Sequence, residues 1–121
     1  MIDVKPAART IDDIRLSDRD RLVIREAAAV LRERFPVKRI VLYGSKARGD
    51  DDRDSDVDLL VLMDHDMNMT ERGEVISAIY PVQMKHMVML SPLIIGEDEW
   101  ENGVYQVLPI HDEIDRDGVL V

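Results

Sequence analysis

The chain has 121 residues, no cysteine and a formal net charge of −9, since 16 lysines and arginines stand against 25 aspartates and glutamates. This length suits one small domain with a single core, and an apolar fraction of 45% is too high for a disordered acidic tail. The absence of cysteine excludes disulfides, thiolate metal sites and cysteine nucleophiles, while the negative charge and the scarcity of aromatic residues argue against direct nucleic-acid binding.

Residues 1–16 carry mixed charges around Pro6 without helical or strand periodicity, so we expect an N-terminal arm before a domain over residues 17–121. The arm lacks the charged-then-apolar order of a signal peptide, and no apolar run approaches the ~20 residues of a membrane span. We therefore expect a cytoplasmic protein without membrane contact.

A helix is predicted to begin at Ser17, because a hydroxyl followed three residues later by the acid Asp20 is a capping-box pattern. Pro36 cannot continue a helix, so it ends this element. The apolar residues of the helix recur at three- and four-residue spacing and predict one buried stripe of Ile24, Ala27, Ala28, Leu31 and Phe35.

Two strands with a polar connection follow the helix. Val37–Tyr43 is rich in β-branched residues and runs into Gly44-Ser45, which predicts a strand that ends in a tight turn. The acidic segment 50–54 is predicted to be a solvated loop. Val57–Met63 is almost entirely apolar, as expected for a central strand that is covered on both faces.

The second half of the chain predicts a helix over Thr70–Tyr80, which Pro81 ends or kinks, and a third strand over Met84–Ile95. Three further elements are a short acidic helix at Gly96–Trp100, a helix over Val104–Ile114 and an edge strand over Gly118–Val121. The predicted fold class is α/β, with a small mixed β-sheet and helices packed on it.

Two aspartates interrupt the apolar pattern around the second strand. Asp56 and Asp58 are two positions apart, so their carboxylates would project from one face of the strand and repel each other. A divalent cation such as Mg²⁺ would relieve this repulsion, and Mg²⁺ prefers oxygen ligands shared with substrate phosphates. Gly44 allows close approach of a polyanion, and Ser45 can donate hydrogen bonds to phosphate. This combination predicts metal-assisted nucleotidyl transfer.

The run Gly44-Ser45-Lys46-Ala47-Arg48-Gly49, followed by Asp56-Val57-Asp58, resembles the signature of the minimal nucleotidyltransferases of the DNA polymerase β superfamily. The specific match covers Val41 to Met63. The resemblance implies a polymerase β-like nucleotidyltransferase fold and transfer of a nucleoside monophosphate, most often AMP from ATP, to a hydroxyl acceptor with Mg²⁺. It further implies that Asp56 and Asp58 are catalytic and hold the metals, and that Gly44, Ser45 and Arg48 bind the nucleotide.

Small members of this family resemble the antitoxin half of toxin–antitoxin pairs, so the resemblance implies a partner of the helical HEPN-domain type, or self-association. The family pattern includes a third carboxylate on a later strand, but Met84–Ile95 contains no acid, and Met87, Met89 and Ser91 occupy the corresponding positions. Two functions are therefore compatible with the sequence. The first is an active nucleotidyltransferase; the second is a catalytically weakened antitoxin or regulatory module that acts by binding its partner.

Residues around this signature have simpler interpretations. Lys46 is predicted to face solvent, and Arg48 either contacts phosphate or pairs with the acidic loop. The seven methionines are interpreted as core filler, with a methionine-rich partner surface as the alternative, and they include Met63, Met67, Met69, Met84, Met87 and Met89.

Overall fold

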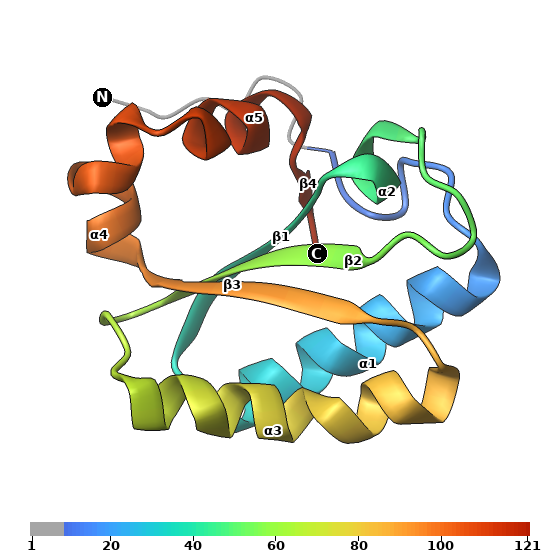
Figure 1. Cartoon of the computed structure of the whole chain (residues 1–121), viewed down its shortest axis with the longest axis horizontal. Helices are drawn as coiled ribbons and strands as arrows, with labels where there is room; N and C mark the ends of the chain where they lie inside the picture. The colour runs from blue at the N-terminus through green and yellow to red at the C-terminus, as the bar shows by residue number, and fades with distance from the viewer. Residues whose placement is uncertain (1–8) are drawn as a thin grey trace.

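The computed structural model describes residues 9–121, so the first eight residues of the expected arm lie outside the described part of the chain. A four-stranded mixed sheet in the order β3-β2-β1-β4 forms its centre (Figure 1). The elements are α1 Asp18–Arg34, β1 Val37–Tyr43, α2 Ser45–Arg48, β2 Val57–Met63, α3 Met69–His86, β3 Leu90–Gly96, α4 Glu97–Asn102, the 3-10 helix η1 Val104–Val107, α5 Pro109–Asp117 and β4 Val119–Leu120. The predicted α/β class is confirmed.

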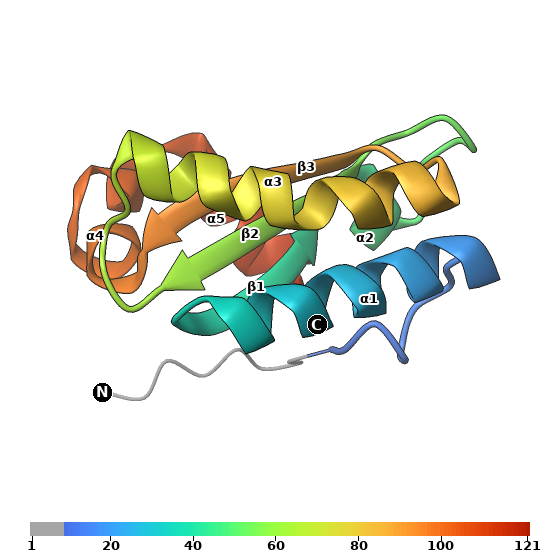
Figure 2. The ribbon, with the colours of Figure 1, turned by 90° about the horizontal axis from the view of Figure 1, so that it is seen from below.

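The sheet lies between two layers of helices. α1 and α3 run side by side across one face (Figure 2), and α4, η1 and α5 cover the other face. β1 is antiparallel to β2 and β4, whereas β2 is parallel to β3 and connects to it through α3. Every residue from Leu59 to Met63 is at most 1% exposed, because β2 is covered on both faces as its apolar sequence predicts.

The local signals of the first half of the chain are confirmed. Ser17 caps α1 by accepting a hydrogen bond from the backbone N–H of Asp20 at 3.0 Å, and the helix ends just before Pro36. β1 and β2 have the predicted bounds, and β4 pairs with β1 at the edge of the sheet. The Asp20 carboxylate does not complete the capping box, because it faces Lys46 on α2 instead.

Two predicted boundaries in the second half are wrong. The helix does not end at Pro81 but continues to His86, so the third strand begins at Leu90 rather than Met84. Pro81 is exposed and gives up one helical hydrogen bond, while Val82 continues the stripe that packs on the core. The helix predicted over Val104–Ile114 is divided at Pro109, which starts α5 at a position where its missing N–H is not needed.

Residues 9–11 lie beside the C-terminal strand. Leu120 donates its backbone N–H to the Arg9 carbonyl at 2.7 Å, and Ile11 donates to the Leu120 carbonyl at 3.0 Å. The Ile11 side chain is 4% exposed and belongs to the core under α1. None of the helices between residues 9 and 121 is both long and apolar enough to cross a membrane.

Candidate functional site

The Gly-Ser turn follows β1 at one end of the sheet. Gly44 has φ +78° and ψ −158°, and it precedes the four-residue helix α2 that begins at Ser45. A Cβ atom at Gly44 would lie 2.4 Å from Oδ2 of Asp58, closer than a side chain can approach. Only glycine therefore permits both this backbone conformation and the contact between the turn and the Asp58 carboxylate.

We expect Gly44→Ala to lower stability more than Gly49→Ala does. Gly49 also has a positive φ, +82°, but an added Cβ there meets no atom within 4 Å. The Gly49 variant should therefore show only the backbone cost of about 1–2 kcal/mol, whereas Gly44→Ala adds the clash with Asp58. Urea unfolding measures both values, and equal losses would show that Gly44 is retained only for its dihedral angles.

Asp56 and Asp58 lie at the same end of the sheet as the turn, because β1 and β2 are antiparallel. Asp58 is directly opposite Tyr43 of β1 and Ser91 of β3, and its carboxylate faces Gly44. Asp56 directly precedes β2, is exposed, and accepts a hydrogen bond from the Ser91 hydroxyl at 3.2 Å. Asp58 thus faces the β1 side of the site and Asp56 faces the β3 side.

The electrostatic surroundings of Asp58 favour its neutral form. Partial burial raises the pKa of the Asp58 carboxyl above its ordinary value, and the negative charges of Asp56 and Glu113 raise it further, against the smaller opposing effect of Arg48. Burial and the negative charges of Asp58 and Glu113 raise the pKa of Tyr43 to about 12. A cation beside Asp58 would offset the unfavourable effect that burial and the neighbouring acids have on its ionised carboxylate. The carboxylates of Asp56 and Asp58 therefore fit Mg²⁺, which prefers oxygen ligands.

The two aspartates would supply only part of a metal's coordination. Within residues 9–121 no group of three or more histidine or carboxylate side chains is placed to hold a metal ion. Ser91 occupies the β3 position opposite Asp58, where a third carboxylate was sought in the sequence. Mg²⁺ commonly completes its shell with substrate phosphates and water, so these would supply the remaining ligands at a site with two carboxylates.

Arg48 pairs with acids in this structure. Its Nε donates to Asp50 at 3.1 Å, and its Nη1 lies 3.8 Å from Glu113 on α5. Phosphate contact by Arg48, the other option left by the sequence, would require it to exchange these partners. Glu113 was missed by sequence reasoning, because a single acid on an amphipathic helix carries no signal of its distant neighbours.

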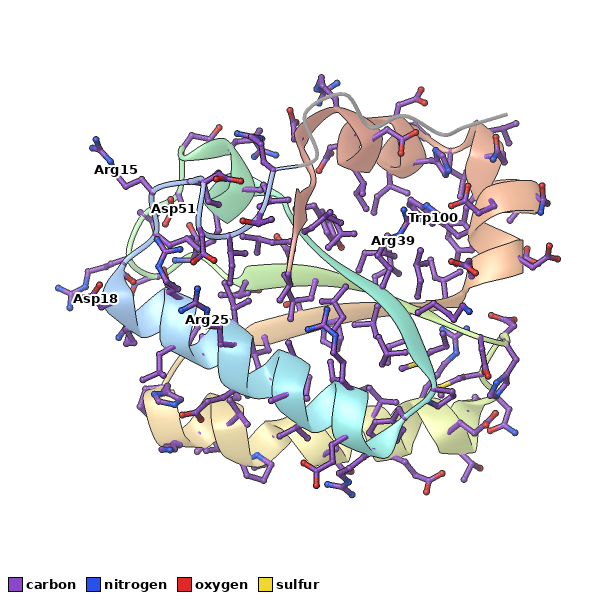
Figure 3. The ribbon with its side chains drawn as sticks, turned by 180° about the vertical axis from the view of Figure 1, so that it is seen from behind. Arg15, Asp18, Arg25, Arg39, Asp51 and Trp100 are labelled. Atoms are coloured by element: carbon purple, nitrogen blue, oxygen red, sulfur yellow. The ribbon has the colours of Figure 1, made fainter. Side chains whose placement is uncertain are left out.

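The prediction that Lys46 faces solvent is wrong. Its side chain is 1% exposed and its Nζ donates to Asp20 of α1 at 2.8 Å and to Asp51 at 3.1 Å. In Figure 3, Asp51 and the start of α1 at Asp18 lie on the same side of the molecule. Asp51 is therefore not merely part of a solvated loop. Burial alone lowers the pKa of Lys46, but the hydrogen bonds to Asp20 and Asp51 outweigh it and raise the pKa above its usual value.

Sequence comparison adds a family match to this geometry. The model of a family described as a nucleotidyltransferase domain matches residues 24–101. A protein of Methanocaldococcus jannaschii described as a protein adenylyltransferase is 31% identical over 70 residues, which are 58% of this chain and 69% of that protein. The part of this chain that the family model matches includes the Gly-Ser turn and both aspartates.

Solved structures share the fold at lower sequence identity. A structure described as a toxin–antitoxin with AMP-PNP aligns with a TM-score of 0.57 at 15% identity, over 85% of this chain and 71% of that chain. A structure described as a minimal nucleotidyltransferase aligns with a TM-score of 0.55 at 24% identity, over 86% of this chain and 96% of the other. At these identities the alignments establish the arrangement of helices and strands.

Proposed function

Because the chain belongs to the nucleotidyltransferase domain family, we propose that it transfers a nucleoside monophosphate from a nucleoside triphosphate, with ATP as donor, to a hydroxyl acceptor. We assign this activity to the domain over residues 17–121; of the preceding arm over 1–16, residues 9–11 pair with β4 and Ile11 packs in the core. The relative described as a protein adenylyltransferase supports a protein as acceptor.

The residues of the site have distinct roles in this proposal. Gly44 and Ser45 hold the triphosphate, and Arg48 leaves Asp50 and Glu113 to contact it. Asp56 and Asp58 hold Mg²⁺, which supplies charge neutralisation on the phosphates when bound. The observation that carries the proposal is the placement of the turn and the two carboxylates at one end of adjacent strands, with Asp58 facing Gly44.

A second candidate function is partner binding without turnover. It is favoured by the absence of any acid from β3, the later strand on which the resemblance implies a third carboxylate; Ser91 of this strand lies opposite Asp58. In this case the protein neutralises or regulates a helical HEPN-type partner by contact alone. The toxin–antitoxin structure with a similar fold agrees with either candidate, because both require a protein partner.

Label transfer separates the two candidates. The protein is incubated with α-phosphate-labelled ATP and Mg²⁺, with and without a co-encoded small helical protein, and the masses of both proteins are determined. We expect Mg²⁺-dependent ATP binding by calorimetry and the mass of one AMP or more on the partner, both abolished by EDTA. Binding of ATP without any labelled protein would contradict the enzyme and leave the contact function.

A further inference from the structure

α3 is apolar on two opposite sides. Its inner side packs on the core through four buried residues, Val75, Ala78, Ile79 and Val82. Its outer side carries a second row at four- and three-residue spacing, here called the outer stripe, which consists of Met69, Gly73, Ile76, Tyr80, Met84 and Met87. Figure 2 shows α3 at the surface, with no other element of the described chain over it. A helix that is apolar all round is usually buried, so the outer stripe calls for a partner.

The outer stripe contains methionines that were interpreted as core filler. Met63 and Met67 are buried, as that interpretation predicts. Four others are 89%, 48%, 75% and 54% exposed, in the order Met69, Met84, Met87 and Met89. The interpretation as core filler is therefore wrong for these four. Ile76 and Tyr80 are also about half exposed, so the stripe forms a continuous apolar surface of the kind that marks a contact between proteins.

Gly73 leaves an open space in the outer stripe. Glycine inside a helix lowers stability relative to alanine, because it gains more freedom in the unfolded chain. A Cβ atom at Gly73 would meet nothing within 4 Å beyond its own stretch of backbone. No contact in the described chain therefore requires glycine at this position. A second helix would use the space, because a large side chain can approach the helix backbone at a glycine.

Met87 ends the outer stripe in a backbone conformation that disfavours it. Its φ of 54° and ψ of 43° are left-handed, a conformation in which glycine is the usual residue. It is the one non-glycine residue with a positive φ among residues 9–121. Since its side chain is 75% exposed, Met87 adds little to the core of its own chain. A strained residue whose side chain is left at the surface is typical of a binding surface.

The outer stripe is complementary to a second copy of itself in antiparallel orientation. In a pair with its two-fold axis at Tyr80, residues equally far before and after Tyr80 lie opposite each other. Ile76 then faces Met84, and Gly73 faces Met87 of the second copy. The smallest residue of the stripe thus receives a long, flexible side chain. The two Tyr80 rings meet at the axis, where they can stack with their hydroxyls at the edge of the contact.

The charges of α3 favour this antiparallel orientation. Glu74 is the one charged residue between Gly73 and Met84, and its exposed carboxylate has no hydrogen bond or ion pair within residues 9–121. In the antiparallel pair it lies level with Lys85 of the second copy, whose side chain is 66% exposed and contacts Glu26. A parallel pair would instead set like charges beside each other, which is unfavourable.

The outer stripe and the candidate site lie on opposite sides of the sheet. Asp58 shares a side of β2 with Leu60 and Leu62, because alternate residues of a strand project in the same direction. These leucines pack with Trp100 and Ile114 of the helices on that side. α3 covers the other side, as Figure 1 shows. A pair formed through α3 would therefore leave both sites open and facing away from each other.

We propose that α3 pairs with α3 of a second copy of this chain through the outer stripe, antiparallel and with the two-fold axis at Tyr80. This interaction goes beyond the proposed function and does not depend on it. An 18-residue helix is about 27 Å long, so one helix pair buries less than the ~1,600 Å² of a standard interface. The dimer should therefore form reversibly, in a fraction that rises with protein concentration.

Sedimentation equilibrium of the full chain tests the pairing. The average mass should rise from that of one chain, 13.9 kDa, toward that of two chains as the concentration increases. Tyr80→Glu places two carboxylates together at the axis and should weaken the dimer at least tenfold. The control Val107→Glu changes a residue that is 80% exposed on η1, across the sheet, and should pair like the wild type. The mass of one chain at every concentration, or equal weakening by both variants, would overturn the proposal.

Cysteine cross-linking tests the register, because the chain has no cysteine of its own. Tyr80→Cys should form a disulfide-linked dimer, since a residue at a two-fold axis lies within reach of its copy. A mixture of Ile76→Cys and Met84→Cys should form the mixed disulfide in preference to either homodimer. Preference for the Ile76→Cys homodimer would reveal a parallel pair and overturn the register. Linkage of Tyr80→Cys no faster than that of Val107→Cys would overturn the interface.

Two variants separate pairing from folding. Gly73→Gln should raise the Tm of the dilute monomer, because glutamine favours a helix, and should weaken the dimer at least tenfold by filling the open space. Met87→Gly should also raise the monomer Tm, and should weaken the dimer by removing the side chain opposite Gly73. Misfolding would then explain neither loss. Dimers that both variants leave unchanged would overturn the proposal, and a monomer that binds a different helical protein through Tyr80 would assign the stripe to that protein instead.

Discussion

Replacing Asp58 by asparagine is expected to reduce nucleotidyl transfer on the order of 10²- to 10³-fold without lowering Tm. The loss of activity follows because the amide removes one of the two carboxylates that hold Mg²⁺ in the proposed site. Stability should be retained, because the neutral amide has no charge to desolvate and no repulsion from Asp56 and Glu113. A functional residue of this kind disfavours folding and favours ligand binding.

Label transfer and thermal unfolding, measured on the same samples, check this expectation. Glu74→Gln is a suitable control, since it also removes one negative charge from an exposed position on α3. The control should transfer label at the wild-type rate. Retention of transfer by Asp58→Asn would remove the carboxylate pair from the proposed mechanism, and a marked fall in Tm would assign Asp58 a structural role.

Replacing Lys46 by methionine is expected to destabilise the protein by about 3–5 kcal/mol, because it leaves the buried Asp20 carboxylate without its cation. The Asp20 side chain is 6% exposed, and its Oδ1 already lacks a hydrogen-bond partner. Desolvation of this charge would no longer be offset by the ammonium group at 2.8 Å. Urea unfolding with an unchanged m-value provides the measurement.

A double variant separates loss of the ion pair from loss of packing. Lys46→Met combined with Asp20→Leu replaces both charges by apolar groups and should recover most of the lost stability, as buried pairs often allow. Lys46→Met alone should also weaken ATP binding, since the same side chain links α2 to α1 and to Asp51. A cost below about 1 kcal/mol for the single variant would mean that Asp20 reaches solvent in solution.

The predictable parts of the fold are those that depend on neighbouring residues. The cap at Ser17, the strand over Val57–Met63 and the turn at Gly44 are encoded in short patterns, and the structure has each where it was predicted. The prediction that the helix ends at Pro81 was wrong because a proline disfavours the helix only locally. The continuation of α3 depends on the contact of Val82 with the core. Tertiary packing outweighed local preference at that position.

Only the parts of the site that lie close together in the sequence could be predicted. The Gly-Ser turn and the aspartate pair could be named because each is a short motif of consecutive residues. The burial of Lys46 depends on Asp20, 26 residues earlier in the chain, and the position of Glu113 depends on α5 packing beside β1. Neither of these long-range contacts produces a pattern that can be recognised in a single sequence.

The antiparallel pairing of β1 with β2 also has a consequence for the order of folding. Residues 44–56 connect β1 to β2 and form a smaller loop than the segment that connects β2 to β3, so the turn and both carboxylates can come together early. The parallel pairing of β3 requires the longer crossover through α3, so β3 joins the sheet after β1 and β2 have paired. Ser91, the β3 residue that donates to Asp56, therefore reaches the site last, after the turn and the two carboxylates have come together.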